Sequence, residues 1–183
     1  MSETPPARLM IFLIRHAHAV AISEDPLRPL SLQGVDECIR LIRFFRSNGS
    51  LPALQFWHSP LRRSQETADR LAAGLAPDAV RLEAPGLLPD DDPEEMARRL
   101  DAVPPEAFIA VVGHEPQLGR LASLLVRGKA KPVLFDLPKG TVLALHRTDT
   151  ATHKTGHPRW RVRWMVTPAL LRALPGDGGM RPL

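Results

Sequence analysis

Two apolar runs that each end in histidine constrain the fold of this chain most strongly. The run RLMIFLI leads into Arg15 and His16, and FIAVVG leads into His114. Nearly uninterrupted apolar runs of this length are typical of parallel strands buried on both faces. The carboxyl ends of such strands form the edge of an open sheet at which ligands bind. We therefore expect these three polar residues to meet at one edge of a sheet.

Strand and helix patterns alternate along the first two-thirds of the chain. Strands are expected over 9–14, 54–59, 80–83 and 108–114, and helices over 31–46, 61–75 and 117–126. A further helix is expected to start at Asp92 as N-cap, with Pro93 first and Glu95 as partner in a capping box. The alternation predicts an α/β fold, a three-layer sandwich with a mostly parallel central sheet and helices on both faces.

The last third of the chain changes character. Residues 141–146 and 160–166 have strand patterns, and a polar segment, 147–159, separates them. We expect an antiparallel hairpin at the C-terminal edge of the sheet, followed by a loose tail over 174–183. In the helix over 31–46, apolar residues at helical spacing predict a buried face, namely Val35, Cys38, Ile39, Ile42 and Phe45.

Length and composition bound the class of protein. The 183 residues suit one domain spanning 1–183, with a core over about 9–168, and 44% are hydrophobic. The single cysteine, Cys38, excludes an internal disulfide framework and fits a reducing compartment. The first residues show no basic segment followed by an apolar one, and no run has the length and hydrophobicity of a membrane span. We expect a cytoplasmic protein without membrane contact.

The net charge is +4, and all but four of the 24 basic residues are arginine. No dense basic run with interleaved aromatic residues occurs, which disfavours nucleic acid as a partner. A local cluster of arginines that binds an anion is the better interpretation, because the planar guanidinium matches phosphate oxygens.

Histidine and arginine at a strand edge indicate phosphoryl chemistry. A neutral imidazole can attack phosphorus, while arginines and a second histidine stabilise the oxygens of the transferring group. Taken singly, each residue has a plainer interpretation as a structural histidine or a solvated arginine. Two histidines are too few to hold a metal, so we expect neither a metal nor an organic cofactor.

Four motifs and the C-terminal hairpin together resemble one family. They are LIRHAHA at 13–19, DPLRPLSLQG at 25–34, SPLRRSQETA at 59–68, VVGHEP at 111–116, and the hairpin that ends in WMVTP. In this order they resemble the histidine phosphatase, or phosphoglycerate-mutase-like, superfamily, and more narrowly the SixA-type phosphohistidine phosphatases. The resemblance covers roughly residues 9–168.

The resemblance implies roles for four residues. His16 would be the nucleophile that is transiently phosphorylated, Arg15 and Arg63 would bind the phosphate, and His114 would be the second histidine of the pocket. The alternative for Arg63 is pairing with Glu66, one helical turn away.

Some positions of the motifs leave alternatives open. Arg28 is a candidate for an additional phosphate ligand, or else a partner of Asp25. Ala17 stands where the family commonly has glycine, and His18 either edges the pocket or is a solvated loop residue.

The proton donor is open among Asp90, Asp91, Glu115, His114 and solvent. Mutase-like relatives carry a glutamate on an inserted segment, and here the corresponding segment, GLLPDDDPEE, is short. A short segment leaves the pocket open, as suits a phosphate carried on a protein.

The resemblance therefore predicts a phosphatase that acts on phosphohistidine of a protein, such as a phosphorelay domain, through a phosphorylated His16. A phosphatase for a small phosphomonoester, such as a sugar phosphate or a nucleotide, is the first alternative. A phosphate- or phosphoprotein-binding module without turnover is the second.

Overall fold

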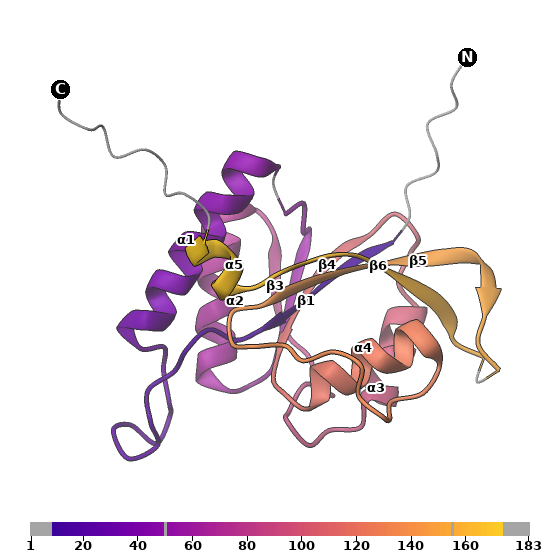
Figure 1. Cartoon of the computed structure of the whole chain (residues 1–183), viewed down its shortest axis with the longest axis horizontal. Helices are drawn as coiled ribbons and strands as arrows, with labels where there is room; N and C mark the ends of the chain where they lie inside the picture. The colour runs from indigo at the N-terminus through magenta and orange to yellow at the C-terminus, as the bar shows by residue number, and fades with distance from the viewer. Residues whose placement is uncertain (1–8, 50, 155, 174–183) are drawn as a thin grey trace.

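A six-stranded sheet forms the centre of the computed structural model, which describes residues 9–49, 51–154 and 156–173 (Figure 1). The strand order is β3-β2-β4-β1-β5-β6. The bounds are β1 (Met10–Arg15), β2 (Gln55–His58), β3 (Val80–Glu83), β4 (Phe108–Gly113), β5 (Val142–Thr152) and β6 (Pro158–Val166). The first four strands are parallel, and β5 and β6 form an antiparallel hairpin at one edge. The predicted sheet is confirmed.

Helices cover both faces of the sheet and complete the predicted three layers (Figure 1). They are α1 (Leu32–Asn48), α2 (Arg62–Leu75), α3 (Pro93–Asp101), α4 (Gln117–Arg127) and α5 (Pro168–Ala173). The side chains of α1, α2 and α5 pack in one hydrophobic cluster, and those of α3 and α4 pack in another. Helix α5 was not predicted, because six residues are too short to show helical periodicity.

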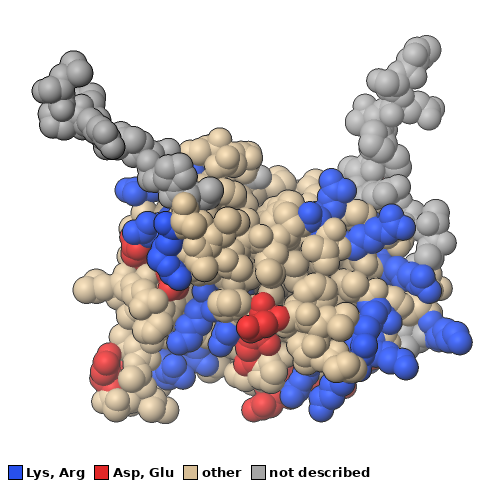
Figure 2. Space-filling view, in the orientation of Figure 1, with Lys and Arg blue, Asp and Glu red and all other residues tan. Residues whose placement is uncertain are grey.

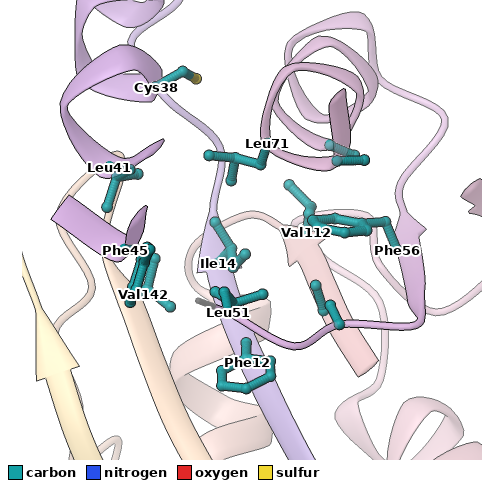
Figure 3. Close-up of a cluster of buried hydrophobic side chains, with 14 of the residues drawn as sticks. Phe12, Ile14, Cys38, Leu41, Phe45, Leu51, Phe56, Leu71, Val112 and Val142 are labelled. Carbon is teal, nitrogen blue, oxygen red and sulfur yellow. The ribbon is translucent and has the colours of Figure 1, made fainter. Parts of the chain in front are cut away.

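Each face of the sheet builds its own hydrophobic core. Phe12 and Ile14 of β1 enter the cluster under α1 and α2, which Figure 3 shows, whereas Ile11 and Leu13 enter the cluster under α3 and α4. Successive strand side chains point to opposite faces. A strand covered on both faces therefore needs apolar residues at every position, which explains the uninterrupted run.

Helix α1 begins as predicted at Ser31, whose hydroxyl accepts a hydrogen bond from the Gly34 N–H. The predicted buried face is wrong at Ile39, which is 40% exposed, while Leu41 is fully buried. The face that packs is therefore rotated slightly from the one that spacing predicts. Cys38 lies within the core, and burial raises the pKa of its thiol to about 12.

Helix α3 has the predicted N-cap but lacks the predicted capping box. The Asp92 carboxylate accepts from the Glu94 N–H at 3.1 Å. The Glu95 carboxylate instead lies 3.9 Å from the Arg99 guanidinium, a weak surface pair. At the end of α4, Gly128 takes the left-handed conformation and stops the helix as predicted.

The polar segment expected as a loop over 147–159 is mostly strand, since β5 continues to Thr152 and β6 begins at Pro158. Tertiary contacts explain the difference. Arg147 donates to the Val103 carbonyl at 3.2 Å, and His153 Nε2 contacts the Leu125 carbonyl at 2.9 Å. These polar side chains find partners on α4 and just after α3, which a local pattern does not reveal. The tail expected over 174–183 lies outside the described residues.

In the described ranges, no helix has the length and apolar character needed to cross a membrane.

The end of the hairpin is held to α3 by one histidine between two carboxylates. His157 Nδ1 lies 2.5 Å from Asp101 Oδ2, and Nε2 lies 2.7 Å from Glu94 Oε2. Burial alone would lower the pKa of His157, but the hydrogen bonds and charges of Asp101 and Glu94 outweigh it and hold the pKa above 6.5.

We expect this contact to stabilise the fold in a pH-dependent way. A raised folded-state pKa gives a contribution that is fully present below pH 6.5 and lost as the pH rises through the folded-state pKa. Wild type should be more stable than His157→Ala by about 1–2 kcal/mol at pH 5.5. Denaturant unfolding should show that the difference in unfolding free energy between wild type and His157→Ala becomes smaller toward pH 9.

Lys154→Ala, which removes an exposed charge from the same hairpin, is the control and should show no such narrowing. A gap between wild type and His157→Ala that widens with pH would contradict the prediction.

Candidate active site

The two histidines predicted to meet lie against each other at the carboxyl edge of the sheet. Strands β1 and β4 pair in parallel with Arg15 opposite Gly113, and the His16 N–H donates to the Gly113 carbonyl at 3.0 Å. The ring centroids of His16 and His114 are 4.9 Å apart, and the rings are tilted by 53°. Both side chains are buried, at 5% and 2% exposed. The expected convergence of the strand ends is therefore present.

Arg63, in the first turn of α2, joins the two histidines. Its Nε donates to His16 Nε2 at 3.2 Å. Glu66 does not hold Arg63, because one carboxylate oxygen accepts from Arg62 at 2.7 Å and the other from the Leu30 N–H at 2.8 Å. Of the two adjacent arginines, Arg63 is the one at the site, and Arg62 is exposed.

Hydrogen bonds fix which nitrogen of His16 carries the lone pair. Nδ1 lies 2.7 Å from the Ala17 carbonyl and donates its proton there, while Nε2 accepts from Arg63. The Ala17 N–H donates to the Thr67 hydroxyl at 3.1 Å, and Thr67 donates to the Arg63 carbonyl at 2.7 Å. Thr67 thus ties the loop after His16 to the helix that carries Arg63. The sequence analysis missed this residue, although it follows Arg63 by four positions, one helical turn.

We assign His114 the opposite tautomer. Ser59 Oγ accepts from the Leu61 N–H at 3.3 Å and lies 2.5 Å from His114 Nε2, and we assign the Ser59 hydroxyl as the donor to Nε2. Nδ1 of His114 then carries the ring proton, and this buried atom has no hydrogen-bond partner among the described residues. A buried N–H without a protein partner beside His16 is suited to a ligand oxygen.

Burial keeps both histidines neutral. It lowers the pKa of His16 from 6.5 to about 3, against the opposing effect of the Ala17 carbonyl and with a further contribution from Arg63 and Arg15. Burial likewise lowers the pKa of His114 to about 3, and the charges of Arg63 and Arg15 add to it. At neutral pH, His16 therefore presents an uncharged Nε2, the form in which an imidazole is a nucleophile.

Arg15 and Arg28 add positive charge around the histidines. The Arg15 guanidinium donates to the Leu137 carbonyl at 2.7 Å. Arg28 has a positive φ of 50° and donates from Nε to the Val20 carbonyl at 3.2 Å. The alternative partner of Arg28, Asp25, instead accepts from the Leu27 N–H at 2.8 Å. The charge of Arg28 contributes to the lowered pKa of Arg63, after burial, and to that of His114.

Lys139 is a fourth cation at the site and was missed by sequence analysis. The next residue, Gly140, donates its N–H to the carbonyls of Arg15 and His16 at 3.1 and 3.2 Å. Burial lowers the pKa of Lys139, and the charges of Arg15 and Arg28 lower it further. The available signal was a lysine three residues before β5, and that position becomes informative only once the pairing of β5 with β1 is known.

The structure separates the carboxyl candidates for a proton donor. Asp90 is exposed, and Asp91 accepts from the Leu88 N–H at 2.8 Å within its own loop. Glu115 is half-buried, and burial raises the pKa of its carboxyl, partly offset by the Arg15 charge. Among the described residues, no three His, Cys, Asp or Glu side chains are grouped to hold a metal ion.

The segment after His16 is also fixed from α1. The His18 N–H donates to the buried Glu37 carboxylate at 2.8 Å, and His18 Nδ1 lies 2.8 Å from Ser31 Oγ. Gly34 faces the same segment closely, since a Cβ built on it would lie 2.0 Å from the His18 carbonyl oxygen. The glycine of DPLRPLSLQG therefore allows α1 to approach the backbone that follows His16.

The fold is similar to that of several solved SixA structures. The protein histidine phosphatase SixA complexed with tungstate superposes with a TM-score of 0.71 at 23% identity, over 88% of this chain and 99% of the other. A SixA from Nakamurella multipartitia, described as a putative phosphohistidine phosphatase, gives a TM-score of 0.67 at 23% identity, over 90% of this chain and 99% of the other. One from Agrobacterium tumefaciens, described likewise, gives 0.67 at 17%, over 87% and 97%.

No protein-family model and no curated protein matches the sequence. The superpositions on solved structures show that the chain has the fold of the SixA-type histidine phosphatases, as its motifs predict.

We expect the two buried histidines to stay uncharged down to about pH 4, because burial and the neighbouring arginines oppose protonation. NMR of the labelled imidazoles, assigned with single histidine variants, should show both rings titrating with midpoints near 3. Between pH 6.5 and 3 the two histidines bind protons in the unfolded chain but not in the folded one. The unfolding free energy should therefore decrease as the pH is lowered through that window. A midpoint near 6.5 for either ring would contradict this account.

We expect Gly34→Ala to disturb both the fold and the site. The added methyl group meets backbone rather than a movable side chain, so the unfolding free energy should fall by about 1–3 kcal/mol. The displacement of the segment after His16 should also shift the His16 imidazole resonances, measured by NMR. Leu32→Ala, at a 91% exposed position on the same helix, is the matched control and should change neither quantity.

Proposed function

We propose that this protein is a phosphatase that removes the phosphoryl group from phosphohistidine on another protein, through a covalent intermediate on His16. The observation that carries the proposal is the state of His16. It is a buried neutral imidazole whose Nε2 lone pair is free of a proton and lies between Arg63 and a second buried histidine.

In the first step, His16 Nε2 attacks phosphorus, a new N–P bond forms, and the P–N bond of the substrate phosphohistidine breaks. The electron pair of that bond leaves with the substrate imidazole, which takes up a proton. Arg63 Nε then donates to a phosphoryl oxygen in place of Nε2, and Arg15 and the His114 Nδ1–H bind the others. The Ala17 carbonyl, which accepts from His16 Nδ1, stabilises the positive charge that develops on the ring.

In the second step, water attacks the phosphorus of phospho-His16, and inorganic phosphate is released as His16 becomes neutral again. We assign to Glu115 the proton that the substrate imidazole takes up in the first step, because burial makes its carboxyl easier to protonate than an exposed one. The Glu115 carboxylate regains a proton from the water that attacks in the second step. Lowered pKa values make the histidines of the site poor proton carriers at neutral pH.

The short segment between β3 and α3 supports a protein substrate. Nine residues, 84–92, connect Glu83 to Pro93, where α3 begins and packs on the sheet. No inserted domain covers the catalytic edge between these two elements. A phosphohistidine on the surface of a folded partner can reach such an edge, whereas an enclosed pocket would admit only a small ester. The similarity in fold to SixA structures supports the same substrate class.

The test is steady-state hydrolysis of a phosphohistidine-bearing phosphorelay domain beside a panel of sugar phosphates and nucleotides. We expect kcat/KM to be highest for the phosphorelay domain. His16→Ala should lower kcat by at least about a thousandfold, because no other group can form the intermediate. Intact-mass spectrometry of quenched wild type should find one added phosphoryl group, which is absent in His16→Ala.

The two adjacent arginines of α2 provide a matched pair. Arg63→Ala should lower kcat/KM by about a hundredfold or more through loss of transition-state charge stabilisation, whereas exposed Arg62→Ala should change it less than about twofold. Preference for one small ester would overturn the protein substrate and leave the chemistry at His16. Phosphate binding without turnover of any substrate would favour a binding module.

A further inference from the structure

The catalytic edge carries more positive charge than one phosphoryl group requires. Four cationic side chains act on it: Arg15, Arg63, Arg28 and Lys139. A phosphoryl group at neutral pH has a charge of about −2 at most. Two cations at the phosphorus, Arg15 and Arg63, already match that charge.

The other two cations form no direct ion pair with the protein. Within the described residues, none of the ion pairs involves Arg28 or Lys139. The Asp25 carboxylate accepts from the Leu27 N–H. Glu37, whose charge partly offsets the effect of burial and of the arginines on the pKa of Lys139, accepts from the His18 N–H and Gln33. One carboxylate does not balance four neighbouring cations, and an anionic ligand relieves the repulsion that remains.

Arg28 and Lys139 come from two loops that flank the phosphoryl site. Gly140 binds the carbonyls of both Arg15 and His16, so Lys139 is fixed directly beside the nucleophile's strand end. The loop with Arg28 is closed by a bridge between Ala19 and Leu30, and the Leu30 N–H is bound by Glu66 of α2, one turn from Arg63. Both side chains are half-buried rather than fully solvated.

Charge effects link the two loops to each other and to the histidines. Lys139 contributes to the lowered pKa of His16, and Arg28 contributes to that of His114, in each case after burial. Arg28 also lowers the pKa of Lys139, after burial and Arg15. The positive charges of Arg28 and Lys139 therefore act on the same region, which is larger than the phosphoryl site itself.

We propose that Lys139, together with Arg28, forms a second anion-binding subsite beside the phosphoryl site, and that the substrate carries a second anionic group close to its phosphoryl group. This inference rests on the proposed function for the phosphoryl site and adds a requirement on the substrate. The second group is a carboxylate or a phosphate, because lysine and arginine bind either one. On a protein it is an acidic side chain next to the phosphohistidine, and on a small molecule it is a second phosphate.

Positive charge anywhere on the surface attracts anions, so the test has to distinguish this general effect from binding at the subsite. Figure 2 shows Lys and Arg side chains at several places on one face of the molecule, with fewer Asp and Glu side chains among them. Lys154, an exposed lysine on the β5–β6 hairpin, therefore provides the control, since Lys154→Ala removes the same charge as Lys139→Ala.

The first measurement is calorimetric binding of methylphosphonate and methylenebisphosphonate, which offer one and two anionic groups and are not hydrolysed. Wild type should prefer the bisphosphonate by at least about tenfold, the size of a charge-assisted contact. Lys139→Ala should remove most of that preference and change methylphosphonate affinity less than about threefold. Lys139→Arg should restore the preference, and Lys154→Ala should keep it. An unchanged preference in Lys139→Ala, or equal losses for both ligands, would overturn the subsite.

The second measurement identifies the source of the second anion. Two phosphohistidine peptides that differ only by Glu or Gln beside the phosphohistidine are compared with a sugar monophosphate and a sugar bisphosphate. Higher kcat/KM for the Glu peptide, lost in Lys139→Ala, supports an acidic side chain. If neither peptide is hydrolysed while the bisphosphonate preference depends on Lys139, the proposed function fails and the subsite stands. The second anionic group is then the second phosphate of a small molecule. If the peptides are hydrolysed equally and Lys139 affects no preference, the subsite fails and the proposed function stands.

Discussion

The parallel pairing of β1 with β4 is the constraint on which the site depends. Its register places Arg15 opposite Gly113, so the next residue of each strand, His16 and His114, leaves the sheet at the same level. A slip by one residue would turn one of the two strands over and send its side chains to the opposite layers. The two hydrophobic cores therefore hold the register, and the register holds the histidines 4.9 Å apart.

Hydrogen bonds from two helices and from the segment before β5 then fix the loop that begins at His16. Thr67 of α2 accepts from the Ala17 N–H, Glu37 of α1 accepts from the His18 N–H, and Gly140, before β5, binds the carbonyls of Arg15 and His16. In the opposite layer, the Leu118 N–H of α4 donates to the His114 carbonyl at 2.9 Å and ties His114 to the start of that helix. The nucleophile is thus oriented by backbone contacts rather than by its own side-chain packing alone, which suits a group that must change charge during reaction.

Much of the fold could be predicted from the sequence because its signals are local. Buried parallel strands read as continuous apolar runs, and Ser31, Asp92 and Gly128 mark helix ends by their own chemistry. The convergence of His16 and His114 was predictable because each directly follows a buried strand, and the family resemblance selected Arg63 as the arginine that joins them. Lys139 and Thr67 were not, since their roles depend on contacts between segments far apart in the chain. The hairpin beyond residue 146 was mispredicted for the same reason, because its polar residues are satisfied by α3 and α4.

The single cysteine has a practical consequence. Cys38 is 1% exposed in the core under α1, and its thiol, with a pKa of about 12, is almost entirely in the unreactive protonated form at neutral pH. A maleimide reagent added to the folded protein will leave it untouched. A second cysteine engineered at an exposed position, such as the turn of the β5–β6 hairpin, can then carry a fluorophore or spin label at one defined place. Two such engineered cysteines allow distance measurements without removal of Cys38.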